Sequence, residues 1–222
     1  MDKTTRFWDR VADSYAKRPI SDEGAYLRKL ELTREYFRPD MQVMEFGCGT
    51  GSTAISHAPF VQHIHAIDVS PRMLAIAQGK ATAAGIENIS FECSSIDAYT
   101  PPDAGLDAIL GLSILHLLDN WQAVIGRVHG MLKPGGIFVT STMCIGGVLR
   151  LLQPVMVVGS YFGKLPSIRF LKEKDLLAAF TEAGFLIDHQ WQPKPKQAIF
   201  LVARKADATG AVSSSARSTD HQ

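Results

Sequence analysis

The stretch Val43-Met-Glu-Phe-Gly-Cys-Gly-Thr-Gly-Ser52 decides the fold of this chain. The apolar residues on either side of Glu45 predict a short strand that is buried on both faces, as in a parallel sheet. Glycines at 47, 49 and 51 then predict a turn whose backbone comes close to a ligand. A buried carboxylate is costly unless a cation or a hydrogen-bond donor meets it. We therefore expect Glu45 to face an amine of that ligand.

The spacing of these glycines separates two kinds of cofactor loop. A dinucleotide-binding loop reads G-x-G-x-x-G and places a diphosphate at a helix N-terminus. Here the pattern is E-x-G-x-G-x-G, and a carboxylate at its start suits an ammonium or sulfonium better than a pyrophosphate. The segment resembles the first motif of class I S-adenosylmethionine-dependent methyltransferases. The N-terminal segment with Tyr15 and Arg18 resembles the cap of the small-molecule, quinone-methyltransferase-like type.

Strands and helices alternate along the rest of the chain. A strand over 61–69 contains Asp68 near its end, where a carboxylate suits the two hydroxyls of a ribose. Dinucleotide-binding proteins share this feature, so Asp68 indicates a nucleoside without choosing between the two families. Ser70 and Pro71 start a helix that runs to 85. Further strands are expected at 89–93, 106–112 and 137–143, further helices at 52–58, 120–132 and 172–183, and a closing pair of strands at 185–192 and 197–205.

These elements predict an α/β fold of the Rossmann-like, doubly wound kind, with a mostly parallel seven-stranded sheet. A C-terminal antiparallel hairpin would distinguish this sheet from a dinucleotide-binding one. We expect a single methyltransferase domain over 1–205, with a helical N-terminal cap at 1–39 and an inserted lid at 144–170. The small, polar sequence of 206–222 predicts a disordered tail.

The resemblance implies S-adenosylmethionine as the cofactor and S-adenosylhomocysteine as its product. It implies that Asp97 accepts from the adenine amino group, that the amide of Ile96 reaches a ring nitrogen, and that Tyr15 covers the cofactor. Met73 contacts the adenine face or simply packs on the sheet. The full expected set is Glu45, Gly47, Cys48, Gly49, Gly51, Asp68, Val69, Met73, Ser95, Ile96, Asp97, Leu112, Tyr15 and Arg18.

His116 is the candidate general base. It follows the fourth strand, at the edge where an open parallel sheet binds its ligands, and many members of the resembled family have a histidine there. An imidazole with its ordinary pKa of about 6.5 suits base catalysis. A lone histidine among leucines is more often a core residue, and Tyr15, the second candidate, lies on a stripe that also suits plain packing. As a hypothesis, His116→Ala lowers turnover and leaves cofactor affinity unchanged.

The apolar segment 144–170 bears on the substrate. Arg150, Gln153 and Pro154 interrupt it, whereas a membrane span needs about 20 apolar residues in a row. We expect a lid over a small, apolar or neutral acceptor. The alternatives are a lipid or quinone acceptor reached by membrane contact through 144–163, a homodimer through this segment, and a cofactor-binding protein without catalysis.

Composition agrees with a soluble domain. The chain has 222 residues, of which 46% are hydrophobic, and a formal net charge of +1, which gives no general attraction to nucleic acid. Three separated cysteines offer no metal set, and the start has no apolar stretch like a signal peptide, so we expect a cytoplasmic protein without a metal. The predicted reaction is methyl transfer by in-line displacement at the sulfonium methyl; an NAD-dependent oxidoreductase is the alternative that the glycine spacing disfavours.

Overall fold

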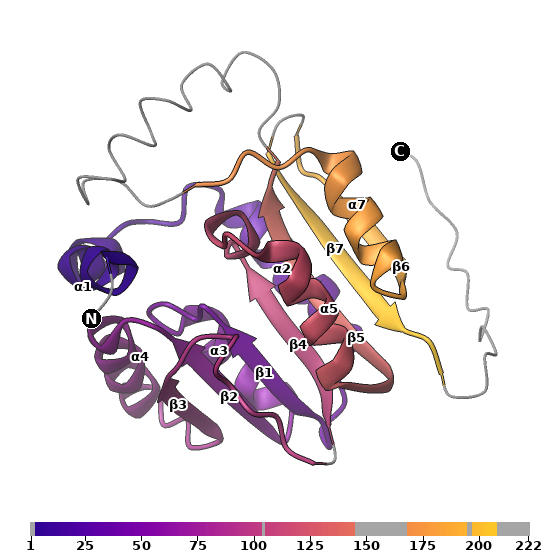
Figure 1. Ribbon diagram of the computed structural model, residues 1–222. Helices are drawn as coiled ribbons and strands as arrows, with labels where there is room; N and C mark the ends of the chain where they lie inside the picture. The colour runs from indigo at the N-terminus through magenta and orange to yellow at the C-terminus, as the bar shows by residue number, and fades with distance from the viewer. Residues whose placement is uncertain (1–2, 104, 145–167, 195–196, 208–222) are drawn as a thin grey trace.

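The computed structural model describes residues 3–103, 105–144, 168–194 and 197–207. Strands and helices alternate along these ranges (Figure 1). The elements are α1 (Lys3–Ala16), α2 (Glu23–Arg34), β1 (Gln42–Phe46), α3 (Ser52–His57), η1 (Ala58–Phe60), β2 (His63–Asp68), α4 (Pro71–Ala83), β3 (Ile89–Cys93), β4 (Leu106–Leu112), η2 (Leu115–Leu117), α5 (Trp121–Met131), β5 (Leu132–Met143), α7 (Glu173–Glu182), β6 (Phe185–Trp191) and β7 (Ala198–Lys205).

Seven strands form one sheet in the order β3-β2-β1-β4-β5-β7-β6. Strands β1 to β5 run parallel, and β7 pairs antiparallel with both β5 and β6. The chain leaves β1 towards β2 on one side and returns to β4 on the other, so a crevice opens at the carboxyl ends of β1 and β4. The predicted mostly parallel, seven-stranded sheet with an antiparallel hairpin is confirmed.

Helices cover both faces of the sheet (Figure 1). Alternate residues of β1 divide between two apolar layers, Val43 on one side and Met44 and Phe46 on the other. The first layer is packed by Leu32 of α2 and neighbours from α3 and α4, and the second by α5 and α7, including the fully buried Phe180. Burial on both faces explains why β1 is almost continuously apolar and why Glu45 stands out within it.

The boundary between α5 and β5 differs from the predicted one. We expected a helix over 120–132 and a turn before a strand at 137, but α5 ends at Met131 and β5 begins at Leu132. Leu132 pairs with Leu106 of β4, and the register then shifts before Ala108, which accommodates the bend at Gly135 inside the strand. Gly135 has the expected positive φ, at 74°.

The cap helix α1 is attached to the start of α4, beside which it lies in Figure 1. The carboxylate of Asp9 accepts a hydrogen bond from the Ser70 hydroxyl at 2.5 Å and another from the Arg72 backbone amide at 3.1 Å. Asp13 pairs with the Arg72 guanidinium at 2.6 Å on the surface. Nearly all of the expected lid and tail lies outside the described residues. Within the described ranges, no helix is long and apolar enough to cross a membrane.

Candidate functional site

Two cavities meet at the carboxyl ends of β1 and β4. The larger has a volume of about 630 Å³ and the smaller about 160 Å³. The two cavities are adjacent, because five residues line both of them: Tyr15, Gly47, Gly49, Leu112 and Ser113. This is the place where a doubly wound sheet binds its ligands. Tyr15 and Leu112 were both expected in the site.

The glycine loop turns through the left-handed region at all three glycines. A Cβ atom at Gly47 would lie 2.7 Å from the Ile114 side chain, and one at Gly51 would lie 2.7 Å from Ala77 on α4. Gly49 has open space above it and lines both cavities. Gly51, expected to bind the cofactor, lines neither cavity; it precedes α3 and allows that helix to approach α4.

Glu45 is buried in the wall of the larger cavity. Its Oε2 atom has no hydrogen-bond partner among the described residues. Burial, and next the charge of Asp68, raise the pKa of Glu45 to about 8. A buried carboxyl group with an unpartnered oxygen is costly, and a cationic donor that reached this oxygen would restore the ionised form of the group. The site therefore fits the amine that the sequence predicts.

Asp68 ends β2 at the smaller cavity. Its Oδ2 accepts from the Gly49 backbone amide and its Oδ1 from the Ser70 backbone amide, each at 2.9 Å. Burial raises the pKa of this carboxyl group, and the two amides oppose the shift. Each carboxylate oxygen can accept more than one hydrogen bond, so the fixed carboxylate remains able to accept from a pair of hydroxyls.

Five further residues that were expected to bind the cofactor line the smaller cavity: Val69, Met73, Ser95, Ile96 and Asp97. Asp97 also accepts from the Asn120 amide at 3.1 Å. A nucleoside needs an apolar slot for its base, an acceptor for ribose hydroxyls and an acceptor for an exocyclic amine, and Asp68 and Asp97 supply the two acceptors. Trp8 of α1, which was not among the expected site residues, also lines this cavity.

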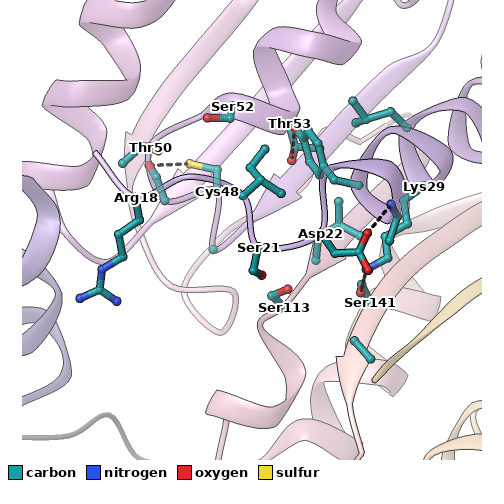
Figure 2. A pocket seen from close by; sticks show the side chains of 18 of the residues that line it. Arg18, Ser21, Asp22, Lys29, Cys48, Thr50, Ser52, Thr53, Ser113 and Ser141 are labelled. Carbon is teal, nitrogen blue, oxygen red and sulfur yellow. Dashed lines mark hydrogen bonds between the residues drawn. The ribbon is translucent and has the colours of Figure 1, made fainter. Parts of the chain in front are cut away.

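The larger cavity extends from the glycine loop to the ends of α2 and β5 (Figure 2). Arg18 and Cys48 line it as expected. Burial raises the pKa of the Cys48 thiol far above neutral pH, which agrees with a packing role. Lys29 and Ser141 also line this cavity and were not expected there. The ammonium of Lys29 donates to the hydroxyl of Ser141 at 2.8 Å.

His116 lies in η2 and lines neither cavity. Its side chain is buried, its Nδ1 has no partner among the described residues, and burial lowers its pKa to about 4. A general base must reach the proton that it removes, directly or through one water. The described cavities do not bring His116 to that position, and its catalytic role stays a prediction.

Several residues that line the cavities were not predicted from the sequence, and three of them are informative. Ser141 carries a usable signal, since it stands near the carboxyl end of the fifth strand. Ser113 has a φ of 59°, which nothing in the residue type predicts, because serine rarely adopts that conformation. Lys29 lies on a charged helix, where a lysine normally faces solvent.

Within the described residues, no group of three or more histidine, cysteine, aspartate and glutamate side chains is placed to hold a metal ion. The pair His63 and His65 is bridged by the Ser90 hydroxyl, at 3.0 Å and 3.1 Å. Both rings thus lie on one face of the sheet, where they share a hydrogen-bond partner on β3.

Comparison with protein-family models matches residues 43–136 to a methyltransferase domain. This range runs from the first residue of the glycine-loop motif to the bend in β5. It contains the acidic residues Glu45, Asp68 and Asp97 of the two cavities.

Several known proteins resemble the chain over longer stretches. An uncharacterized methyltransferase, YcgJ of Bacillus subtilis, is 27% identical over 132 residues, which are 60% of this chain and 52% of that protein. The aligned part thus spans about half the length of that relative. Its crystal structure superposes with a TM-score of 0.67 at 16% identity, covering 82% of this chain and 99% of the other.

A ubiquinone biosynthesis O-methyltransferase of Methylocella silvestris is 28% identical over 194 residues, covering 74% of this chain and 73% of that protein. The N-methyltransferase NodS of Bradyrhizobium japonicum, solved in complex with S-adenosyl-L-homocysteine, superposes with a TM-score of 0.65 at 18% identity. That superposition covers 92% of this chain and 99% of NodS.

Proposed function

Because this chain belongs to the class I S-adenosylmethionine-dependent methyltransferases, we propose that it transfers a methyl group to a small organic acceptor. One observation carries the proposal. A cavity lined by Asp68 and Asp97 adjoins a larger cavity that is lined by Glu45, whose buried Oε2 atom has no hydrogen-bond partner among the described residues. An adenosyl group linked to an amino acid needs hydrogen-bond acceptors for its adenine amino group, its ribose hydroxyls and its amine, in that order along the molecule.

S-adenosylmethionine fits the residues that are present. Asp68 would hold the ribose, Asp97 the adenine amino group and Glu45 the amine of the methionyl part, with Tyr15 and Arg18 covering it from the cap. When bound, the cofactor supplies an electrophilic methyl group on a sulfonium. The chain itself would orient the two reactants, exclude water, and accept a proton where the acceptor has one to lose.

The larger cavity is the proposed acceptor site. It extends beyond Glu45 and the glycine loop to apolar side chains such as Ile20, Leu30 and Met143. These walls support an acceptor with an apolar body, in line with the small, apolar or neutral molecule that the sequence suggests. A cavity of about 630 Å³ beside the glycine loop also supports an enzyme over a cofactor-binding protein without catalysis.

A quinone or lipid acceptor is the second candidate. The likeness to a ubiquinone biosynthesis O-methyltransferase favours it, at 28% identity. The segment 144–163, through which membrane contact or homodimerisation was expected, lies outside the described residues except for Cys144. Cosedimentation with phospholipid vesicles tests this candidate: binding that disappears when 145–163 is replaced by a polar linker would favour it over a freely diffusing acceptor.

Isothermal titration calorimetry tests the cofactor assignment directly. We expect micromolar binding of S-adenosylmethionine and S-adenosylhomocysteine, no binding of NAD or NADP, and loss of adenosyl-ligand binding in Asp68→Ala, because the ribose loses its acceptor. Asp107→Ala serves as a control for carboxylate removal, since Asp107 pairs with Lys133 and lines neither cavity. Binding of NAD alone, or of no nucleotide, would overturn the assignment.

A further inference from the structure

Lys29 is placed unusually for a lysine on a surface helix. It is half-buried, it lines the larger cavity, and its ammonium reaches from α2 to the hydroxyl of Ser141 at 2.8 Å. Figure 2 shows Lys29 directed towards Ser141, with Arg18 at the opposite end of the view. An ammonium has three donors, and this contact is its only hydrogen bond within the described residues. Two donors are therefore left for the cavity.

The other charged groups of the larger cavity are already engaged. Lys80 donates to the hydroxyls of Thr50 and Ser52 at 3.1 and 3.2 Å. Asp22 caps α2 by accepting from the Ala25 amide at 3.0 Å. Its charge favours the ammonium form of Lys29, but no hydrogen bond joins the two side chains in the described structure.

Two more charges belong to the proposed cofactor site. Glu45 would meet the methionyl amine, and Arg18 would cover the methionyl part from the cap. Among the described residues, Lys29 and Lys80 then remain as cations of this cavity without an ion-pair partner, and Lys29 has one hydrogen bond where Lys80 has two. Burial lowers the pKa of Lys29, so the ammonium is held at a cost that a bound anion would offset.

Ser141 completes a pair of donors. It is buried on β5, where it pairs with Leu112 of β4 on one side and Phe200 of β7 on the other. Its carbonyl also accepts from the Ser113 amide at 2.8 Å, so its position is fixed by the sheet. Because the Ser141 oxygen accepts from Lys29, its own O–H is free to donate to a second atom.

We propose that Lys29 and Ser141 form a carboxylate-binding subsite, and that the acceptor is a small organic acid with an apolar body. One ammonium and one hydroxyl match the two oxygens of a carboxylate, whereas a phosphate is normally met by more donors. The apolar walls contributed by Leu30, Met143 and Ala198 suit the rest of such a molecule. This inference rests on the proposed function, because it assigns the acceptor end of the same cavity. It keeps the apolar body of the acceptor and replaces the neutral molecule that the sequence suggests with an anionic one.

The test uses the full chain saturated with S-adenosylhomocysteine and three matched pairs of probes: benzoate and benzamide, cinnamate and cinnamamide, octanoate and octanamide. Affinities are measured by saturation-transfer NMR. We expect at least one acid to bind at least about tenfold more tightly than its amide, as a charge-assisted pair would require. Lys29→Met should abolish this preference, and Ser141→Ala should reduce it.

Arg28→Met is the matched control. Arg28 is the preceding residue on α2, is 51% exposed at its side chain and pairs with Glu31, so its replacement removes the same charge outside the cavity. The acid preference should survive in this variant.

Three outcomes would overturn the inference while leaving the proposed function standing. In the first, no acid binds more tightly than its amide, although S-adenosylhomocysteine binds. In the second, the preference persists in Lys29→Met. In the third, Lys29→Met weakens S-adenosylhomocysteine itself, which would assign the lysine to the cofactor. Failure of the wild-type chain to bind S-adenosylhomocysteine would instead overturn the proposed function, and the inference with it.

Discussion

At the scale of single residues, Glu45 is the group whose chemistry should change most when the cofactor binds. In the ligand-free protein, burial raises the pKa of Glu45 to about 8, so the carboxyl group is mostly protonated at neutral pH. An ammonium beside it favours the ionised form and lowers this pKa. Binding must then release a proton, and affinity must increase as the pH rises towards 8.

We predict release of roughly one proton per S-adenosylhomocysteine at pH 7, measured by calorimetry in buffers that differ in ionisation enthalpy. In Glu45→Gln the release should disappear and the affinity should lose its dependence on pH over this range. Asp68 would meet neutral hydroxyls, but its charge helps to raise the pKa of Glu45, so the Asp68→Asn variant should reduce the release without abolishing it. Equal proton release in Glu45→Gln and wild type would contradict the assignment of Glu45 to an amine.

A glycine in the loop is required either by a positive φ or by a close neighbour, and a comparison of Gly47 with Gly49 distinguishes the two requirements. Both have positive φ, at 65° and 54°, so alanine at either position costs about 1–2 kcal/mol of backbone strain. At Gly47 the new Cβ would also lie 2.7 Å from Ile114, whereas at Gly49 nothing lies within 4 Å. We predict that Gly47→Ala lowers the free energy of unfolding by about 1–3 kcal/mol more than Gly49→Ala, as overpacking does.

Urea denaturation of the ligand-free protein measures this difference. Binding is the wrong readout for it, because both glycines line the cavities and either alanine can obstruct a ligand. Equal losses of stability in the two variants would mean that Ile114 moves aside without cost.

At the scale of elements, the contact between α1 and α4 should control access to the nucleoside cavity. Thr4, Trp8 and Tyr15 of α1 line that cavity, so the helix must stay docked to close it. Asp9 secures the docking by accepting from Ser70 and from the Arg72 amide at the first turn of α4. Asp13 pairs with Arg72 on an exposed surface, where an ion pair contributes little.

We predict that Asp9→Ala speeds hydrogen exchange of the α1 amides and weakens S-adenosylhomocysteine binding about three- to tenfold, as loss of a cap of about 1 kcal/mol would. Asp13→Ala should change both by less than about twofold. Both variants remove one carboxylate from the same helix, so net charge is matched. A larger effect of Asp13→Ala would indicate that the ion pair, and not the cap, holds α1.

The elements themselves were largely predictable, because each follows from a local pattern. Ser70 and Pro71 mark the start of α4, and the glycine loop follows β1 as expected. The boundary at Leu132 was wrong because strand pairing with Leu106 extends β5 across a proline-glycine turn, a long-range effect that no local signal carries. The expected lid, outside the described residues except for its ends, remains a prediction.

At the scale of the whole molecule, most of the residues that the sequence predicted for the cofactor line one of the two cavities, whereas Lys29 and Ser141 were not predicted. Many of the predicted residues follow the ends of parallel strands, and the sheet brings those ends together. Lys29 reaches the site from a helix that precedes the sheet, and its contact with Ser141 joins residues 112 positions apart. Such a contact depends on how α2 packs, which residue spacing does not reveal.

In the proposed binding mode, the cofactor contacts several elements of the domain at once. The two cavities are lined by α1, the glycine loop, and the ends of β2 and β4, so a ligand that fills them stabilises the folded chain and has no site in the unfolded one. At 100 times its dissociation constant, S-adenosylhomocysteine should stabilise the fold by about 2.7 kcal/mol. For a domain of this size, that corresponds to a rise in Tm of roughly 5–10 °C. Differential scanning calorimetry measures the shift, which should be absent with NAD and in Asp68→Ala at the same ligand concentration. Equal shifts in Asp68→Ala and wild type would mean that the ligand binds outside the cavity at the end of β2.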